Sequence, residues 1–299
     1  MNKTRFLAIT ALLLNATATA AVLGGGGPAS TKPAALKSPA NRSATMSTPK
    51  QQVIDVLKAI ETGASAPFAV INPQNYTHHI LGAADGLTGY RALLQALPAG
   101  SARVNTVRVF QDGNHVFTHT DYNFFGPKIG IDVFRFENGR IVEHWNNVQQ
   151  TPTGPNPSGH TMIDGPTTAT DLQHTQRNKQ LVARFVDDIL VHGRMDKLTA
   201  YFDGDRYIQH HPQIADGLSG LGAALDAMAK VGVTMRYTKV HKVLGEGNFV
   251  LVMSEGTLGG KPTSFYDLFR VENGKIAEHW DTVETIPARS EWKNGNGKF

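Results

Sequence analysis

The sequence DLFRVENGKIAEHW at residues 267–280 repeats an earlier one, DVFRFENGRIVEHW at residues 132–145. Over the longer windows 132–148 and 267–283, 11 of 17 aligned positions are identical. Each copy places Asn-Gly between two apolar stretches, which indicates a two-residue β-hairpin because both turn positions favour positive φ. The sequence therefore predicts a duplicated domain that contains this hairpin in each copy.

Similarity further upstream extends the repeat to a whole domain. Residues 76–89 correspond to residues 207–220 at an offset of 131, and both contain Tyr-x-x-His followed by Ala-Asp-Gly-Leu. Each copy begins with a helical pattern, and Thr48-Pro49 is a typical N-cap with proline at the first helical position. The rest of each copy alternates apolar and polar residues as strands do. This order predicts an α+β fold with helices packed on one face of a curved antiparallel sheet.

The N-terminal residues predict export. Lys3 and Arg5 precede a nine-residue apolar run, 6–14, and Ala18-Thr19-Ala20 supplies a small-x-small cleavage pattern. Nine apolar residues are too few for a membrane anchor, because a membrane span needs about 20. The chain has no cysteine, so we expect neither a lipid-modified cysteine nor a disulfide. A periplasmic or secreted protein, free of the membrane after cleavage, is expected.

The chain divides into six expected segments: a signal peptide (1–20), a disordered linker (21–47), domain 1 (48–152), a second linker (153–170), domain 2 (171–288) and a tail (289–299). The first linker has almost no large apolar residue and cannot bury enough surface to fold. The net charge of +4 is mild, and no Lys/Arg cluster alternates with aromatic residues. Nucleic-acid binding is therefore not indicated.

The motifs of both copies resemble the SnoaL-like polyketide cyclase family of the nuclear transport factor two-like superfamily. The resemblance rests on YIQHHP at 207–212, DGLSG at 216–220 and DLFRVENGKIAEHWD at 267–281. It implies a cone, or α+β barrel: a strongly bent antiparallel sheet closed by helices around an apolar cavity. It also implies aldol ring closure by a carboxylate, without metal or cofactor. The superfamily also holds isomerases, dehydratases, epoxide hydrolases and binding modules. Domains of the family pair through the outer sheet face, which implies an intramolecular pseudo-dimer or a homo-oligomer.

The hairpin gives an independent way to assign residues to a face. With a regular turn, Asp267, Glu278 and Trp280 share the face that is richer in large apolar groups, and we assign it to the interior. A β-bulge near Trp280 would place His279 and Asp281 there instead, and bulges are frequent beside active sites. Both arrangements remain open at this point.

Asp267 is the first candidate for an acid/base. An apolar cavity disfavours its charged form and raises its pKa toward neutral pH. A structural role, capping the hairpin or pairing with Arg270, is equally compatible with the sequence. His210 could polarise a carbonyl or move a proton, or it could tie the strand to a helix. The candidate catalytic residues are Asp267, His210, His279 and Asp281, and the candidate ligand-binding residues are Tyr207, His211, Glu278 and Trp280.

The second copy is the better candidate for a working site. Asp281 corresponds to Asn146 in the first copy, and an amide cannot exchange a proton at useful pH. We therefore expect the first copy to serve mainly as a packing partner. His210 and His211 are adjacent on a strand and point to opposite faces, which disfavours a metal site. No cofactor is expected.

Two functions remain open. The first is a cofactor-free enzyme of the aldol cyclase or isomerase type, which makes or breaks C–C or C–H bonds beside the carbonyl of a small apolar molecule. The second is a non-catalytic exported module that binds such a molecule. A proton-transfer carboxylate inside the cavity would distinguish the enzyme from the binding module.

Overall fold

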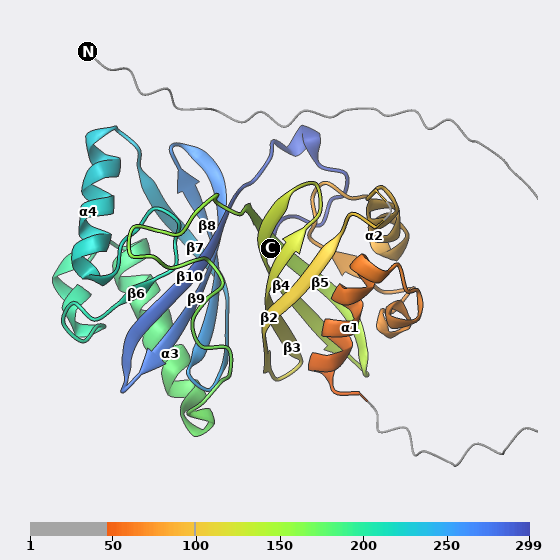
Figure 1. Ribbon diagram of the computed structural model, residues 1–299, viewed down its shortest axis with the longest axis horizontal. Helices are drawn as coiled ribbons and strands as arrows, with labels where there is room; N and C mark the ends of the chain where they lie inside the picture. Colours follow the sequence, from red (N-terminus) through yellow and green to blue (C-terminus); the bar gives the residue numbers. More distant parts are fainter. Residues whose placement is uncertain (1–46, 99) are drawn as a thin grey trace, which may run out of the picture. The chain divides into compact units, whose positions relative to one another are not determined.

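Two similar α+β units form the described part of this computed structural model, residues 47–98 and 100–299 (Figure 1). The expected signal peptide, and the first linker apart from residue 47, lie outside the described residues. The first copy contains α1 (Pro49–Thr62), η1 (Ala66–Val70), β1 (Thr77–His78), α2 (Gly86–Gln95), β2 (Arg103–Asp112), β3 (His115–Asn123), β4 (Pro127–Glu137) and β5 (Arg140–Gln150). The second contains η2 (Leu172–His174), α3 (Thr175–Phe185), η3 (Val186–Val191), η4 (Met195–Ala200), β6 (Ile208–Gln209), α4 (Gly217–Lys230), β7 (Met235–Glu246), β8 (Phe249–Leu258), β9 (Lys261–Glu272) and β10 (Lys275–Thr285), followed by η5 (Arg289–Glu291).

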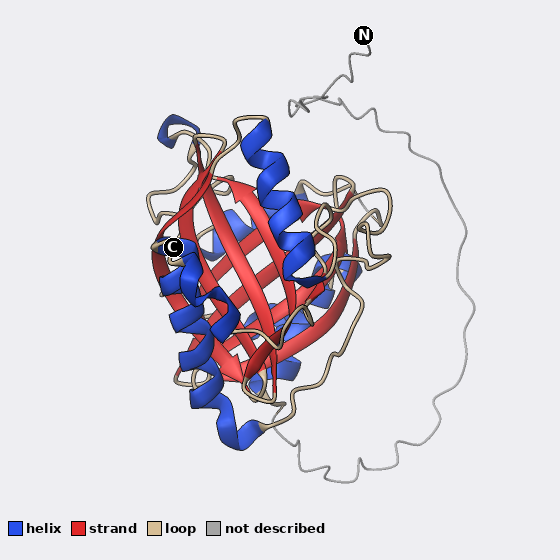
Figure 2. Ribbon diagram, turned by 90° about the vertical axis from the view of Figure 1, so that its left-hand side faces the viewer, coloured by secondary structure: helices blue, strands red, loops and turns tan. Residues whose placement is uncertain are grey.

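Each copy forms one five-stranded sheet, and the two strand orders match. They are β1-β5-β4-β3-β2 and β6-β10-β9-β8-β7. Pairing is antiparallel except that the short first strand of each sheet runs parallel to the last strand. The predicted duplicated α+β fold is confirmed, and Figure 2 shows the strands with helices along them. The strands form no closed barrel among the described residues, because both sheets are open.

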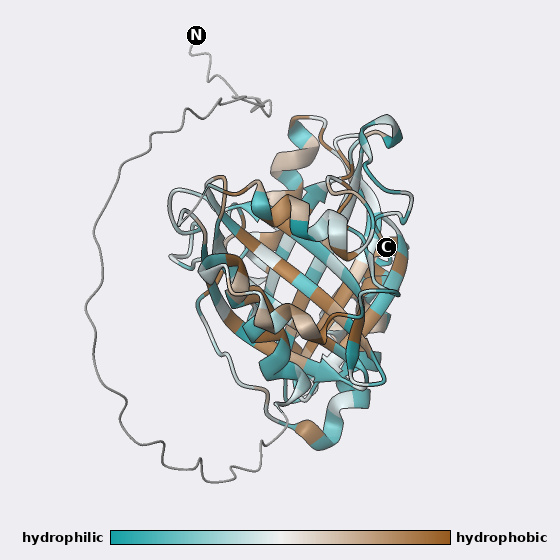
Figure 3. Ribbon diagram, turned by 90° about the vertical axis from the view of Figure 1, so that its right-hand side faces the viewer, coloured by the Kyte–Doolittle hydropathy of each residue, from teal (hydrophilic) through white to brown (hydrophobic). Residues whose placement is uncertain are grey.

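The helices pack on one face of each sheet, called the inner face below. Thr48 caps α1 by accepting a hydrogen bond from the Gln51 main-chain N at 3.3 Å. The apolar side of α1, with Val53, Val56 and Leu57, is buried in the first core. Figure 3 shows apolar stretches on these strands and helices. Among the described residues, no helix combines the length and apolar character needed to cross a membrane.

The outer faces of the two sheets pack against each other. One buried cluster combines Phe110 and Trp145 of the first copy with Phe249 and Trp280 of the second. The Phe110 and Phe249 rings stack with centroids 4.5 Å apart. Stacked and interleaved aromatic rings of this kind contribute both buried area and specific geometry. The two copies therefore form an intramolecular pair.

The segment that follows each copy crosses to the other copy. Asn156, after the first sheet, donates from Nδ2 to two main-chain oxygens in the loop 209–214 of the second copy, at 2.5 and 3.0 Å. Asn294, after the second sheet, donates from Nδ2 to two main-chain oxygens in the loop 80–83, both at 2.9 Å. The expected tail is thus hydrogen-bonded to the first copy.

The hairpin between β9 and β10 contains a β-bulge. Asn273 and Gly274 form the predicted turn, with φ of 50° and 72°. Ile276 pairs with Val271, but Glu278 pairs with Arg270, so Ala277 is an extra residue on β10. The first copy has the matching register shift at Val142.

The regular register expected for this hairpin is therefore wrong. Asp281 lies opposite Asp267, and Trp280 lies opposite Leu268. Because successive side chains of a strand point to opposite faces, one extra residue moves every later residue to the other face. His279 and Asp281 consequently share the inner face with Asp267, whereas Glu278 and Trp280 face outward.

Deletion of Ala277 tests the role of the bulge. The deletion would turn Trp280, which is 0% exposed, away from the outer-face cluster. We expect the free energy of unfolding to fall by about 3–5 kcal/mol, as when a buried Trp is truncated. Urea unfolding followed by circular dichroism measures this change. The matched control is Ala277→Val, since the first copy carries Val142 at the bulge, and it should remain close to wild type. Equal stability of the deletion and the control would contradict the bulge's role.

Candidate active site

Three ionisable side chains meet on the inner face of the second sheet. Asp267 comes from β9, and His279 and Asp281 come from β10. Their exposed fractions are 2%, 8% and 7%. Asp267 and Asp281 are direct cross-strand partners, so one buried imidazole lies beside two carboxylates. The bulge at Ala277 produces this arrangement.

His279 is held between two oxygen acceptors. Its Nε2 lies 3.1 Å from Asp267 Oδ1, and its Nδ1 lies 2.9 Å from Gln209 Oε1. The Tyr237 hydroxyl donates to Asp267 Oδ1 at 3.2 Å. Gln209 Nε2 donates to the Tyr207 hydroxyl at 3.4 Å. Both bonds of His279 are satisfied together when each ring nitrogen carries a hydrogen.

Asp281 is the least satisfied member of this group. Its Oδ1 is buried and has no hydrogen-bond partner among the described residues. Its Oδ2 lies 3.8 Å from His211 Nε2, beyond hydrogen-bonding distance. A buried oxygen without a partner costs free energy unless a water, an ion or a ligand satisfies it. Asp281 therefore offers a free oxygen to a ligand.

The pKa values of Asp267 and His279 are both raised. Burial raises the pKa of Asp267, against the opposing effect of the His279 hydrogen bond. Burial also disfavours the charged form of His279, but the hydrogen bond to Asp267 and the charges of Asp281 and Asp267 outweigh it, so the pKa of His279 is raised. Asp267 and His279 therefore retain protons to higher pH than the isolated side chains would.

Aromatic and apolar groups surround the cluster. The Phe269 ring stacks on His279 with centroids 4.7 Å apart. Leu218 and Leu221 of α4 contact the same core and remain partly exposed. The matching residues of α2 in the first copy are buried. The inner face of the second copy is therefore less tightly covered by its helix than that of the first.

The first copy contains a similar pair that sequence reasoning did not single out. His144 Nε2 lies 2.9 Å from Asp132 Oδ1, and the Tyr122 hydroxyl donates to Asp132 Oδ2 at 2.7 Å. The constant offset of 135 residues to the second copy's Asp–His pair was the available signal. Asn146 stands in place of Asp281. The copies therefore differ at the free carboxylate and share the Asp–His pair.

Tyr237 and Gln209 were also missed. Tyr237 lies on β7, at the far edge of the sheet from β10, and no sequence motif connects it to Asp267. Gln209 pairs with His279 in the β6–β10 register. The short strand was predicted, and its parallel register with β10 was not.

His210, Glu278 and Trp280 lie on the outer face, contrary to the interior position expected for the last two. His210 Nε2 lies 2.8 Å from Glu278 Oε1, and its ring stacks on Trp280 with centroids 4.6 Å apart. Arg270 donates to Glu278 Oε2 at 2.5 Å. Gln209 occupies the inner position beside His279, so the next residue, His210, faces outward.

These outer-face residues belong to the contact between the copies. Arg108 of the first copy lies 4.3 Å over the Trp280 ring, and Lys242 of the second lies 4.2 Å over the Trp145 ring. The His79 ring stacks on Trp145 with centroids 4.9 Å apart, as the His210 ring stacks on Trp280. This reciprocal packing explains why the Glu and the Trp of the Glu-His-Trp motif occur in both copies.

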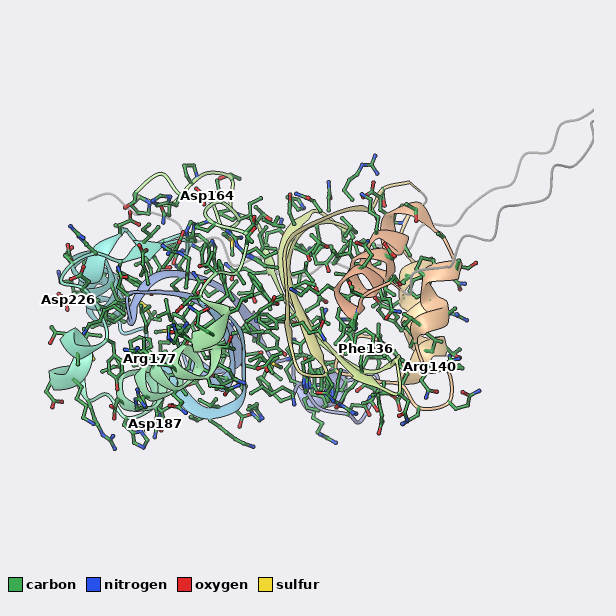
Figure 4. All side chains as sticks on the ribbon, turned by 90° about the horizontal axis from the view of Figure 1, so that it is seen from below. Phe136, Arg140, Asp164, Arg177, Asp187 and Asp226 are labelled. Atoms are coloured by element: carbon green, nitrogen blue, oxygen red, sulfur yellow. The ribbon has the colours of Figure 1, made fainter. Side chains whose placement is uncertain are left out.

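Two groups of side chains have ligand atoms within 4.8 Å of one another, close enough to hold a metal ion. One is the inner-face group of Asp267, His279 and Asp281. The other, on the outer side, consists of His160, Asp164 and His210. Asp164, on the linker, is labelled in Figure 4. The metal-binding potential of the second group could not be foreseen from His210 alone.

Two hollows open on the described surface away from the inner-face cluster. One, of about 600 Å³, lies between the start of α3 and the β9–β10 turn. Another, of about 230 Å³, is lined by the linker, His210 and Pro212. Neither is lined by the inner-face acids or by His279. The inner-face cluster is therefore distinguished by its polar geometry and not by a large hollow.

A family model described as a SnoaL-like domain matches residues 65–144 and 182–279. The chain belongs to the SnoaL-like family. Each copy of the repeat carries one match, which confirms the predicted resemblance. No curated protein matches the chain.

Several solved structures are similar to a part of the chain. An NTF2-like protein from Burkholderia xenovorans LB400 is 25% identical, with a TM-score of 0.29, over 37% of this chain and 92% of that one. A candidate ketosteroid isomerase from Kribbella flavida DSM 17836 is 18% identical, with a TM-score of 0.30, over 39% and 87%. An LEH-like epoxide hydrolase from M. tuberculosis is 20% identical, with a TM-score of 0.29, over 37% and 85%.

NMR titration of the His279 ring tests the electrostatics of the site. We expect a pKa above the ordinary 6.5, and a lower pKa in Asp281→Asn, which removes a neighbouring negative charge. Since the folded pKa exceeds the unfolded value, the stability contributed by protonated His279 is complete below pH about 6.5 and is lost as pH rises through the folded pKa. His78, whose pKa burial lowers, is the internal comparison. A His279 pKa at or below that of His78 would contradict this electrostatic analysis.

Proposed function

We propose that the protein is an exported, cofactor-free acid/base enzyme of the aldol cyclase or isomerase type, acting on a small apolar carbonyl compound. Its site would be the inner face of the second copy. The observation that carries this proposal is the free, buried Oδ1 of Asp281 beside His279. Residues 1–20 support export through their charged start, apolar run and small-x-small pattern.

Asp281 would act as the general base. It would take a proton from the carbon next to the substrate carbonyl, while the C–H electron pair moves to the carbonyl oxygen as an enolate. The Tyr207 hydroxyl oxygen accepts a hydrogen bond from Gln209 Nε2. The hydroxyl hydrogen of Tyr207 can therefore donate to the carbonyl oxygen of the substrate. Return of the proton at another carbon gives isomerisation, and attack of the enolate carbon on a second carbonyl gives ring closure. A positioned base of this kind contributes about 10²–10⁴-fold in rate.

Asp267 would then position His279, in place of the direct acid/base role expected from sequence. Both of its oxygens are within 3.3 Å of the Tyr237 hydroxyl, and Oδ1 also contacts His279. Asp281, with its free Oδ1, would thus transfer the proton, and Asp267, with both oxygens hydrogen-bonded, would position His279.

The second candidate function is a non-catalytic module that binds an apolar molecule. The observation that favours it is the first copy, which keeps the Asp132–His144 pair but carries Asn146 at the position of the free carboxylate. A pair retained without a proton acceptor fits ligand orientation or structural support better than turnover. Binding without proton transfer is the behaviour this alternative predicts.

Proton exchange at carbon distinguishes the two functions. The protein is incubated with 2-tetralone, an apolar ketone with exchangeable α-hydrogens, in D₂O, and deuterium uptake is followed by mass spectrometry. We expect uptake above the buffer rate, and a fall of about 10²-fold or more in Asp281→Asn because the base is lost. Ketone binding, followed by tyrosine and tryptophan fluorescence, should persist in that variant.

The matched control is Asp226→Asn, which makes the same substitution at an exposed position of α4 (Figure 4). It should leave exchange unchanged. Because the first copy folds with Asn146 at the equivalent position, Asp281→Asn should also fold. Binding by wild type without exchange would replace the enzyme proposal with the binding module. Equal exchange by wild type and Asp281→Asn would remove Asp281 from the reaction.

A further inference from the structure

Two histidines and an aspartate meet where the linker crosses the second sheet. His160 and Asp164 lie on the linker, and His210 follows β6. His210 Nδ1 lies 2.7 Å from Asp164 Oδ1, and His160 Nδ1 lies 3.4 Å from Asp164 Oδ2. The two imidazole centroids are 5.2 Å apart. One carboxylate is thus bracketed by the Nδ1 atoms of two imidazoles.

Each imidazole directs its other nitrogen at a further carboxylate. His210 Nε2 lies 2.8 Å from Glu278 Oε1, and His160 Nε2 lies 3.1 Å from Asp216 Oδ2. Arg270 holds Glu278 in place at 2.5 Å. Metal-binding histidines typically donate their non-ligating N–H to a carboxylate, which fixes the tautomer and orients the ring. Both rings have this arrangement here.

His210 Nδ1 faces two oxygen acceptors. A neutral imidazole carries a hydrogen on one nitrogen, and the Glu278 bond takes it at Nε2. Nδ1 then directs a lone pair at Asp164 Oδ1 and at the Thr161 main-chain oxygen, which is 2.8 Å away. Both oxygens are acceptors, and the His210 side chain is only 1% exposed. A metal ion bound by Nδ1 and Asp164 would lie among these oxygen atoms.

We propose that His160, Asp164 and His210 bind one divalent transition-metal ion of the Zn²⁺ type. Two imidazole nitrogens and one carboxylate oxygen suit such an ion. In a tetrahedral site, bonds of about 2.0–2.2 Å from the metal ion to each ligand atom place neighbouring ligand atoms about 3.3 Å apart. The Asp164 side chain is 43% exposed and can shift to admit the ion. The hollow of about 230 Å³ beside His160 and His210 leaves room for a water as a further ligand.

The ion would fasten the linker to the second copy, since two ligands come from the linker and one from the domain. The first copy offers no such group among the described residues, because His79 Nδ1 faces the Gly297 main-chain oxygen at 3.1 Å. His210 and His211 do point to opposite faces, as expected, and do not share the ion. The additional ligands come from the linker, whose path was not predictable.

Zinc binding to the untagged full chain tests the proposal. Isothermal titration with ZnCl₂ should give one ion per chain, and Co²⁺ should give the visible absorption of a tetrahedral site. His160→Ala, at a partly exposed position, should weaken binding at least tenfold. Asp216→Asn removes the carboxylate that accepts the hydrogen bond of His160 Nε2. This substitution should weaken zinc binding about tenfold, at the lower end of the 10–100-fold that is typical when the hydrogen-bond partner of a metal ligand is lost. His79→Ala is the matched control and should bind as wild type does.

Two results would overturn the proposal. Absence of binding by wild type at millimolar ZnCl₂ would mean that the three side chains hold no metal ion. Stoichiometric binding that survives His160→Ala and disappears in Asp281→Asn would place the ion in the inner-face group. Melting temperatures measured without zinc show whether each variant is folded. Neither result depends on the ketone exchange experiment.

Discussion

The one-residue β-bulge at Ala277 determines what each side of β10 does. It sets Glu278 opposite Arg270, where the two form an ion pair, and it turns His279 and Asp281 toward the helices. The side chains of one short motif, Glu-His-Trp-Asp, are thereby divided between two environments. Glu278 and Trp280 join the contact with the first copy, and the other two join the buried acid cluster. A regular strand would exchange these environments and leave both incomplete.

The duplication explains the use of the outer face. Each copy supplies a Trp that receives a cation from the other copy, Arg108 over Trp280 and Lys242 over Trp145. The segments after the two sheets cross in the same reciprocal way, through Asn156 and Asn294. A single copy would expose these aromatic rings to water. The tandem arrangement therefore buries a surface that each copy needs covered, while the inner faces remain free to diverge.

The sequence predicted the fold through local signals that the structure retains. The repeat, the Thr48 cap and the Asn-Gly turn each depend on neighbours along the chain. The bulge could not be placed, because Ala277 and Val142 are ordinary strand residues and only the cross-strand pairing identifies them. Asp267, His279 and Asp281 were named as candidates, but their grouping depended on that pairing. Tyr237 reaches Asp267 across the sheet, which is a tertiary contact without a sequence pattern.

Disulfide mapping of the β9–β10 register tests the central claim most directly, because the chain has no cysteine of its own. With the bulge, Thr263 lies opposite Thr285, whereas the regular register would place Glu284 there. Directly opposed residues have Cβ atoms about 4.5–5.5 Å apart, near the range that a disulfide bridges. We predict that Thr263→Cys with Thr285→Cys forms a disulfide on mild oxidation and that Thr263→Cys with Glu284→Cys does not. The reverse result would place Asp281 on the outer face and contradict both the site and the interface described here.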